Sequence, residues 1–283
     1  MLSDRSLLES EEVDPMDKEY KRLKCIRKGK GGELLWLVFD HVEKHNALGD
    51  EMQLELIGLF EKIVFDNEIR CVVLTGSGEK AFSAGGDIKY FQSLNPVTFH
   101  DYLYHRGAHI QRLMNCMEKP IVAAVNGLCL AGGMELALSC DMIYASENAR
   151  FGLTEINIGG VPGWGGTARL PLKIPVNRAK EMIFRGEIIS AQEAYRLGLV
   201  NRVLPTIEAL YEEVETACLE MLAKPPLALK AAKNVINNAV TCDSIEAALA
   251  IERGTCVYLF GTEDNKEAVA AFAEKRKPTF IGR

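Results

Sequence analysis

Two glutamates lie in apolar surroundings, each beside a glycine-bearing segment of the chain. Glu135 stands in LAGGMELALSCD (130–141), and Glu155 stands in FGLTEINIGGVPGWGGTARL (151–170). A carboxylate is costly to bury unless it is paired or its pKa rises. Two such carboxyl groups predict general acid and base chemistry, because that chemistry depends on pKa values shifted by the environment. Either glutamate alone would more often be part of a structural ion pair.

A third segment, AFSAGGDIKYF (81–91), also carries a glycine pair. In this segment and in the one around Glu135, glycines follow a predicted strand and open a turn or helix, where backbone N–H groups are free. Two such groups that converge on one point would form an oxyanion hole; for either segment alone, tight packing of a turn is the alternative. No segment has the spacing of a phosphate or dinucleotide-binding loop, and the sequence contains no GxSxG or HExxH.

Stretches typical of strands and of helices alternate through the first part of the chain. The predicted strands are ELLWLVFD (33–40), CVVLTG (71–76), PIVAAVNG (120–127) and MIYASE (142–147), and the predicted helices cover 49–66, 97–117 and 133–140. This alternation favours an α/β fold with buried strands. After about residue 173 the pattern is mostly helical, with one further strand predicted over 199–205.

Composition limits the class of protein. The 283 residues suit one large domain or one domain with an appendage, and the formal net charge of −6 argues against general nucleic-acid binding. No apolar run approaches the roughly 20 residues of a membrane span, and the acidic N-terminus does not resemble a secretory signal. The eight cysteines include no CxxC pair, which favours reduced thiols and a cytoplasmic location.

We expect three parts: a mobile N-terminal extension over 1–20, an α/β core over 21–205 and a C-terminal helical region over 206–283. The helical region is expected to pack on its own core or on a partner subunit. His105 and His109 have an i, i+4 spacing that could face a metal. No acidic or cysteine partner is evident for them, so we interpret them as surface or interface histidines and expect no metal site.

Taken together and in order, these motifs resemble those of the crotonase superfamily, the enoyl-CoA hydratase/isomerase family. The resemblance runs from about Lys21 to the C-terminus, through EKHNAL (43–48), GEKAFSAGGDIK (78–89), KPIVAAVNG (119–127), GGMELALSCD (132–141), ARFGLTEINIGGVPGWGGTARL (149–170), AQEAYRLGLVNRVLP (191–205) and EAVAAFAEKRKPTF (267–280). It implies a crotonase-like spiral of ββα units whose C-terminal helices drive trimer formation, commonly with two trimers in a hexamer. It also implies an acyl-CoA substrate, and no cofactor besides the coenzyme A of that substrate.

The resemblance further implies roles for particular residues. The backbone N–H groups of Gly86 and Gly132 would hold the thioester carbonyl oxygen, and the helix that starts at Gly132 would direct its dipole at the same atom. Glu135 would activate the water that attacks C3, and Glu155 would deliver a proton to C2, although the roles could mix through a shared water. Gly163 would orient that water through its backbone N–H.

A second group of residues matches positions that contact coenzyme A in this family. They are Ala47 and Leu48 at the adenine side, Ala84, Gly86, Asp87, Ile88 and Lys89 along the pantetheine, and Lys275, which would reach phosphate groups, often from a neighbouring subunit. For two of these residues a structural role is the alternative to a contact with coenzyme A. Asp87 is also placed to cap a helix, and Lys275 in EKRKP also fits a solvated run of charges.

The chain departs from the family pattern at two places. His41 and Val42 stand where the family usually has Arg-Pro, which predicts a looser turn. Trp164 directly follows Gly163, so its side chain is expected near the acyl end of the substrate. There the indole would shorten the pocket or stack on a ring, unless it packs into the core beneath the loop.

We therefore predict an enoyl-CoA hydratase, a lyase of acyl-CoA and fatty acid metabolism that adds water across the 2,3 double bond. The first alternative is a Δ3-Δ2 enoyl-CoA isomerase, but isomerases of the family usually manage with one carboxylate, and both are kept here. A hydratase of a cyclic enoyl- or dienoyl-CoA is a second alternative. A non-catalytic paralogue that binds CoA or RNA is a third, against which the intact glutamates and the net acidity argue.

Overall fold

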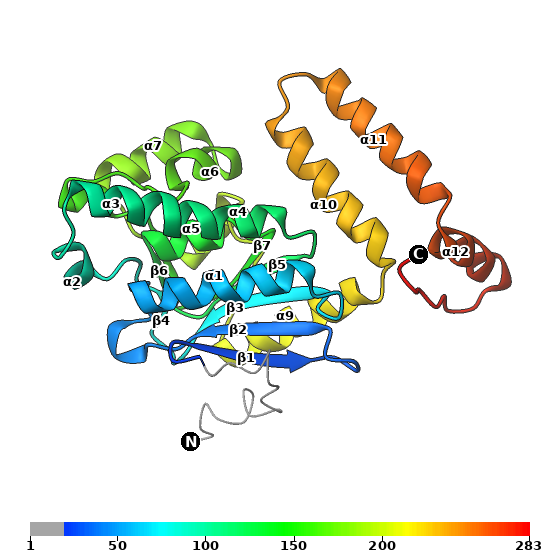
Figure 1. The fold of residues 1–283 in the computed structure, drawn as a ribbon, viewed down its shortest axis with the longest axis horizontal. Coiled ribbons are helices and arrows are strands. Elements are labelled where there is room, and N and C mark those ends of the chain that lie inside the picture. Colours follow the sequence, from blue (N-terminus) through cyan, green and yellow to red (C-terminus); the bar gives the residue numbers. More distant parts are fainter. Residues whose placement is uncertain (1–19) are drawn as a thin grey trace.

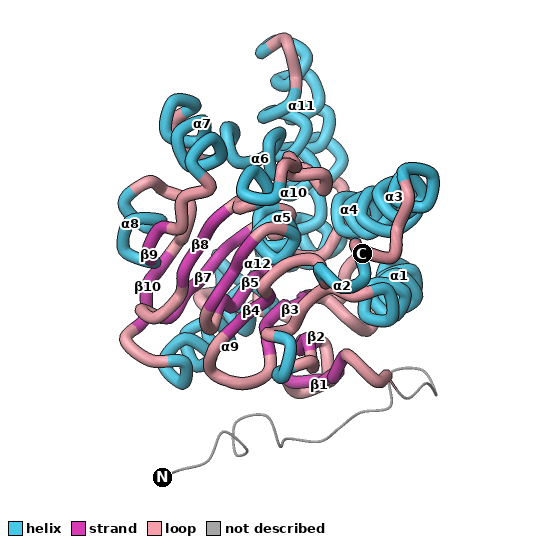
Figure 2. Tube along the Cα trace, turned by 90° about the vertical axis from the view of Figure 1, so that its left-hand side faces the viewer, coloured by secondary structure: helices cyan, strands magenta, loops and turns pink. Residues whose placement is uncertain are grey.

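Two β-sheets form the centre of the computed structural model, which describes residues 20–283, and helices cover both (Figures 1 and 2). The predicted extension over 1–20 lies outside the described residues except for its last residue. The larger sheet has six strands in the order β1 (Leu23–Lys28), β2 (Leu34–Phe39), β3 (Cys71–Gly76), β5 (Ile121–Val125), β7 (Met142–Ser146) and β10 (Arg202–Leu204). β1 and β2 are antiparallel, and the other neighbours are parallel.

The central strands of this sheet are buried and mostly apolar, as expected where helices cover both faces of a sheet. Successive side chains of a strand point to opposite faces. Leu37 of β2 lies in the hydrophobic cluster that includes residues of α1 (Asp50–Phe65), whereas its neighbour Trp36 lies in the cluster that includes residues of α9 (Ile207–Leu222). The Trp36 ring meets Tyr211 of α9 edge to face, with 5.4 Å between ring centroids.

The smaller sheet has four very short strands, in the order β4 (Ala81–Ser83), β6 (Leu128–Leu130), β8 (Arg150–Gly152) and β9 (Ile189–Ser190). β4, β6 and β8 are parallel, and β9 is antiparallel to β8. The sequence pattern did not predict these strands, because two or three residues are too few to show a period. The same three parallel strands carry the loops of the candidate site.

Helices between the strands cover the sheets on the side of α1. They are α2 (Ile88–Phe91), α3 (Pro96–Tyr102), α4 (Ala108–Cys116), α5 (Gly132–Leu138), α6 (Gly166–Lys173), α7 (Val176–Arg185) and α8 (Ala191–Arg196). The long helix predicted over about 97–117 is confirmed as a helical run from Pro96 to Cys116. A π-helical segment, Leu103–Gly107, lies between α3 and α4, and apolar spacing does not reveal the wider turn.

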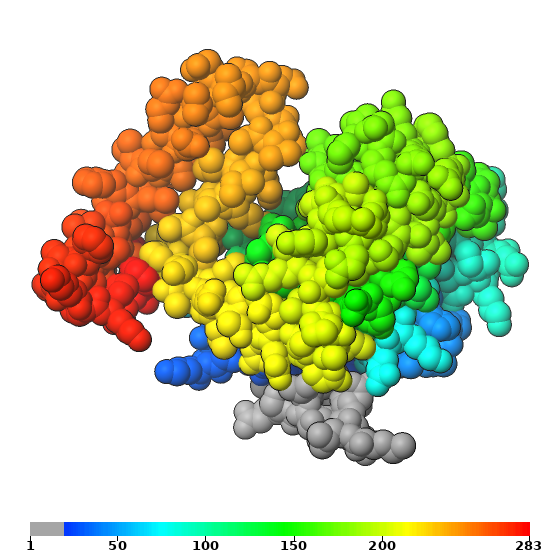
Figure 3. All heavy atoms as spheres, turned by 180° about the vertical axis from the view of Figure 1, so that it is seen from behind, coloured from blue at the N-terminus to red at the C-terminus, as the bar shows by residue number. Residues whose placement is uncertain are grey.

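The last three helices, α10 (Pro226–Thr241), α11 (Ile245–Phe260) and α12 (Glu263–Glu274), extend away from the sheets. Figure 3 shows a hollow between the arm formed by α10 and α11 and the rest of the molecule. α9 packs on the larger sheet, although it lies inside the predicted helical region. The mixed α/β fold with helices at its C-terminus is confirmed. No helix between residues 20 and 283 has the length and apolar character needed to cross a membrane.

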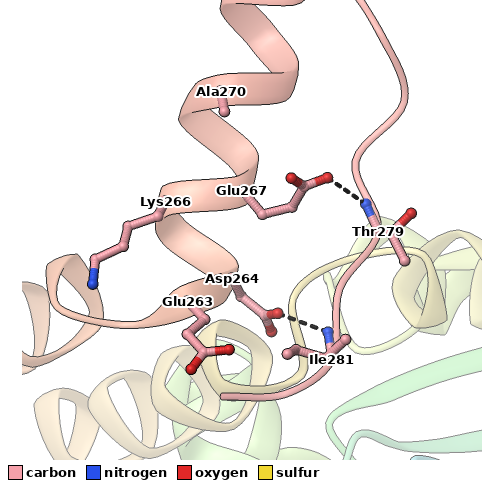
Figure 4. A pocket seen from close by; sticks show the side chains of 7 residues that line it. All are labelled: Glu263, Asp264, Lys266, Glu267, Ala270, Thr279 and Ile281. Atoms are coloured by element: carbon pink, nitrogen blue, oxygen red, sulfur yellow. Dashed lines mark hydrogen bonds between the residues drawn. The ribbon is translucent and has the colours of Figure 1, made fainter.

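The C-terminal tail folds back along α12 (Figure 4). The carboxylate of Asp264, which is 1% exposed, accepts hydrogen bonds from the backbone N–H groups of Ile281 and Gly282, at 2.7 and 2.9 Å. Glu267 accepts another from Thr279 N–H, at 2.9 Å. These bonds tie the tail to the helix that precedes it.

Candidate active site

Three site segments follow the carboxyl ends of three neighbouring parallel strands. Gly86, Gly132 and Glu155 each come two or three residues after the end of β4, β6 and β8 respectively. The carboxyl ends of adjacent parallel strands meet at one edge of a sheet, so this topology brings the three residues together. Open sheets commonly bind ligands at such an edge.

The two glycine loops touch each other. A Cβ added to Gly132 would lie 3.8 Å from the backbone nitrogen of Gly86, and one added to Gly85 would lie 2.7 Å from Ala131 Cβ. Gly132 is the first residue of α5, so its N–H has no partner within the helix. Ala131 has φ +46°, a strained value for a residue other than glycine. The two backbone amides are therefore neighbours, as an oxyanion hole requires.

The turn that carries Ala47 and Leu48 is joined to the first glycine loop by backbone hydrogen bonds. Leu48 N–H donates to Gly85 O at 2.8 Å, and Ala84 N–H donates to His45 O at 3.0 Å. Asn46, which is fully buried, fixes this turn by binding three backbone groups. The sequence analysis missed its role, because two of these three partners, Ser77 and Ala81, are more than 30 residues away in the sequence.

Glu135 projects from α5 and is 3% exposed. Its Oε1 accepts hydrogen bonds from the backbone N–H groups of Trp164, at 2.7 Å, and Gly166, at 2.8 Å. Burial raises the pKa of Glu135 to about 7, the nearby Glu155 carboxyl adds to the rise, and the two amides oppose it. The carboxyl group is thus poised to exchange a proton near neutral pH.

Glu155 begins a 3₁₀ turn, Glu155–Ile158, and its pKa is also raised by burial. Its Oε2 is buried and has no hydrogen-bond partner among the described residues. An unpartnered buried carboxyl oxygen requires a ligand or water to satisfy it. The two predicted glutamates interact electrostatically, and burial holds the pKa of each above its ordinary value.

The amides that hold Glu135 are those of Trp164 and Gly166, and the sequence analysis did not identify them. Gly163, to which it assigned an N–H for the water, is exposed and directly precedes this pair. The Trp164 indole is 4% exposed and packs against Tyr102, with 5.7 Å between ring centroids. The indole therefore packs into the core beneath the loop, which is the alternative that the sequence analysis left open, in a space beside Tyr102 and Gly107.

Of the predicted coenzyme A contacts, Asp87 has a clear structural role. Its side chain caps α2 by accepting Lys89 N–H at 3.0 Å and pairs with Lys44 Nζ at 2.6 Å. Ile88 and Lys89 are exposed beside it. Lys275 is exposed at the end of α12, and Figure 1 shows α12 and α2 at opposite ends of the molecule. Within one chain, Lys275 therefore cannot reach the glycine loops.

The remaining candidates have simple surroundings. His109 pairs with Glu61 at 3.1 Å, so an acidic partner exists that the sequence pattern did not show. His41, at the position of the expected looser turn, is 9% exposed and contacts Glu43 at 3.2 Å. In the part of the chain that the structure describes, no three His, Cys, Asp or Glu side chains are grouped to hold a metal ion. All eight cysteines are free.

Paired carboxyl groups beside two neighbouring glycine amides are typical of an enzyme that moves protons next to a carbonyl group. Comparison with known proteins agrees. The family model described as enoyl-CoA hydratase/isomerase matches residues 30–283. A crotonyl-CoA hydratase from Syntrophomonas wolfei is 38% identical over 90% of this chain and 96% of its own. A short-chain-enoyl-CoA hydratase from Clostridium acetobutylicum is 40% identical over 88% and 94%.

A crystal structure of an enoyl-CoA hydratase from Bacillus anthracis superposes with a TM-score of 0.89, at 33% identity, over 93% of this chain and 100% of that one. The chain therefore belongs to the enoyl-CoA hydratase/isomerase family, and the predicted membership of the crotonase superfamily is confirmed. The activity is that of an enoyl-CoA hydratase, a lyase, and the isomerase alternative is not favoured.

Proposed function

We propose that the enzyme hydrates a short, linear 2-enoyl-CoA, with Glu135 as the base and Glu155 as the acid. The observation that carries this proposal is the electrostatic interaction between the buried Glu135 carboxyl and the half-buried Glu155 carboxyl, both with raised pKa values, beside the glycine amides. In the reaction one O–H bond of water breaks as its oxygen bonds to C3, Glu135 takes that proton, Glu155 gives its own proton to C2, and the π bond between these carbons is lost. Transfer of the proton from Glu135 to Glu155 then restores the starting state. No electron is gained or lost, so the reaction needs no redox cofactor.

Glu135 suits the role of base because its position is fixed and one oxygen is left for the water. Both amide bonds end on Oε1, so Oε2 is the atom that would accept the proton. A pKa of about 7 leaves a substantial ionised fraction at neutral pH while keeping the group basic. The raised pKa of Glu155 favours its protonated form, which is the form that can donate to C2.

Gly86 and Gly132 would hold the thioester oxygen as negative charge develops on it during the attack at C3. One such donor typically contributes about 3–4 kcal/mol to the stability of the transition state. The order of events at the site would be binding of the carbonyl oxygen, attack by water held between the carboxyl groups, and protonation of C2. Gly163 would then assist through its N–H at the mouth of the site.

For coenzyme A we propose contacts with Ala47, Leu48, Ala84 and the segment 86–89, which form one continuous surface through the bonds between the turn and the loop. Asp87 would act there by fixing the loop, since its carboxylate already has two partners. Lys275 would reach the phosphates only from another subunit. Large apolar side chains exposed on the terminal helices support a homotrimer or hexamer: Ile236, Val240, Val257, Phe260 and Phe272.

We propose a cytoplasmic enzyme, which the free cysteines support because thiols persist in a reducing compartment. The names of the relatives at 38% and 40% identity, crotonyl-CoA and short-chain-enoyl-CoA hydratase, support a short acyl chain. A panel of crotonyl-CoA, a longer 2-enoyl-CoA, a 3-enoyl-CoA and a cyclic enoyl-CoA, with products identified by mass spectrometry, tests the proposal. Crotonyl-CoA should gain one water fastest. Conversion of the 3-enoyl-CoA alone, with no change in mass, would instead establish an isomerase.

A further inference from the structure

The π-helical segment Leu103–Gly107 contacts the loop 163–166 at two points. A Cβ added to Gly163 would lie 2.9 Å from Leu103 Cδ2. A Cβ added to Gly107 would lie only 1.8 Å from Trp164 Nε1 and 2.1 Å from its Cδ1. The indole thus occupies the space that any side chain at position 107 would need, and Trp164 can lie where it does only because residue 107 is glycine.

The residue anchored in this way also supplies a hydrogen bond to Glu135. The Trp164 indole is buried between Gly107 and the ring of Tyr102, while its backbone N–H donates to Glu135 Oε1 at 2.7 Å. Packing of the Trp164 side chain therefore also fixes the position of the Trp164 backbone N–H, which binds the Glu135 carboxylate. Packed side chains of this kind restrict the position of a site more tightly than a free loop does.

A guanidinium group also holds the same loop, through a backbone carbonyl. Arg169 Nη1 donates to Trp164 O at 3.3 Å, and its Nη2 donates to Asn115 Oδ1 of α4 at 3.4 Å. Arg169 Nη1 also lies 1.9 Å from the point where a Cβ of Gly165 would be. The carbonyl of residue 164 is thereby fixed by α6 and α4, and its side chain by the π-helical segment.

We propose that the π-helical segment is a positioning element for catalysis: it seats the Trp164 indole, and the seated residue holds the Glu135 carboxylate in line for proton transfer. Trp164 acts through its backbone and is a positioning residue, with no contact to substrate required of its side chain. A π-helical turn widens the helix by one residue and occurs often at functional sites. The inference rests on the proposed role of Glu135 as base.

Two single variants and their combination test the proposal by a double-mutant cycle. Trp164→Ala removes the anchor, and Gly107→Ala adds a methyl group that collides with it. Each should lower kcat about tenfold, the effect of losing one hydrogen bond to a charged group, with KM within about twofold. In Gly107→Ala/Trp164→Ala the collision is gone, so kcat should be no lower than in Trp164→Ala alone.

The pH profile separates positioning from mere stability. The groups that face Glu135 are Glu155 from its 3₁₀ turn, Arg169 from α6 and Tyr102 from α3, and none of them is changed in these variants. The Trp164 N–H lowers the pKa of Glu135, so a loosened bond should move the acid limb of the kcat/KM profile to higher pH. If Trp164 had only a structural role, its substitution would lower the melting temperature and leave the acid limb of the kcat/KM profile unchanged.

Gly58→Ala is the matched control, because a Cβ at this helical glycine of α1 would meet nothing within 4 Å. It should leave kcat and the acid limb unchanged. Additive losses of kcat in the double-mutant cycle would overturn the inference. A pH profile of kcat/KM for Trp164→Ala that is identical to wild type would also overturn it, and this measurement does not require Gly107→Ala to fold. Full activity of Glu135→Gln would instead remove the proposed base, so the two failures are distinguishable.

Discussion

Replacing Glu135 by glutamine should stabilise the protein at high pH and not at low pH. The buried carboxyl group has a pKa of about 7, against 4.5 for a glutamate in water. Below pH 4.5 the folded and unfolded chains both carry the proton, so burial of the neutral acid has no pH-dependent cost. Between pH 4.5 and pH 7 the unfolded chain ionises while the folded chain keeps its proton, so folding loses stability over this window, and the loss levels off above pH 7.

The size of this effect follows from the difference between these two pKa values. That difference corresponds to about 3 kcal/mol, most of which develops between pH 5 and pH 8. Glutamine has no charge to desolvate and keeps a carbonyl oxygen for the N–H groups of Trp164 and Gly166. The advantage of Glu135→Gln over wild type should therefore grow by about 2 kcal/mol over this range, or about 5 °C in melting temperature.

Thermal unfolding of both proteins at matched concentration, in steps from pH 5 to pH 8, measures this difference. Glu79→Gln is the control, because the Glu79 side chain is exposed, and it should follow wild type at every pH. A difference between Glu135→Gln and wild type that stays constant across the range would refute the reasoning, since it would mean that the Glu135 carboxyl is not held against ionisation by burial.

Three further predictions concern catalysis and assembly. Because the base must be ionised, kcat/KM should fall by about tenfold per unit below pH 7, and a profile flat down to pH 5 would contradict the raised pKa of Glu135. Gly85→Ala places a methyl group 2.7 Å from Ala131 Cβ at a residue with φ +92°, so it should separate the two glycine loops and lower kcat by about 10²-fold at an almost unchanged fold; near-normal kcat would argue against paired amides. Sedimentation velocity should show a trimer or hexamer, and a stable monomer at micromolar concentration would exclude a role for Lys275 in trans.

The sequence was sufficient for elements whose pattern is long enough to be periodic. The apolar runs over 33–40 and 71–76 became β2 and β3, and the helical spacing over 49–66 became α1. The very short strands β4, β6 and β8 were not predicted, although they are the strands that bring the glycine loops together. Their pairing depends on contacts between distant segments, which no local pattern records.

Some residues of the candidate site could likewise be predicted from the sequence, and others could not. Glu135 and Glu155 could be identified because a carboxyl group in an apolar run is visible in the sequence. The two amides that hold Glu135 could not, since a backbone N–H has no signature of its own and its direction depends on the fold. For Trp164 the sequence left two positions open, the acyl end of the substrate and the core, and the space beside Gly107 places its ring in the core.

The most direct test of the two-glutamate mechanism is the rate of water addition to crotonyl-CoA by wild type, Glu135→Gln and Glu155→Gln under saturating substrate. Binding of a non-reactive acyl-CoA, measured by calorimetry, shows that each variant still forms the complex. Both variants should bind with nearly wild-type affinity and lose at least about 10²-fold in kcat, as expected for removal of a general acid or base. A variant that binds normally and hydrates crotonyl-CoA at close to the wild-type rate would contradict the role proposed here for that glutamate.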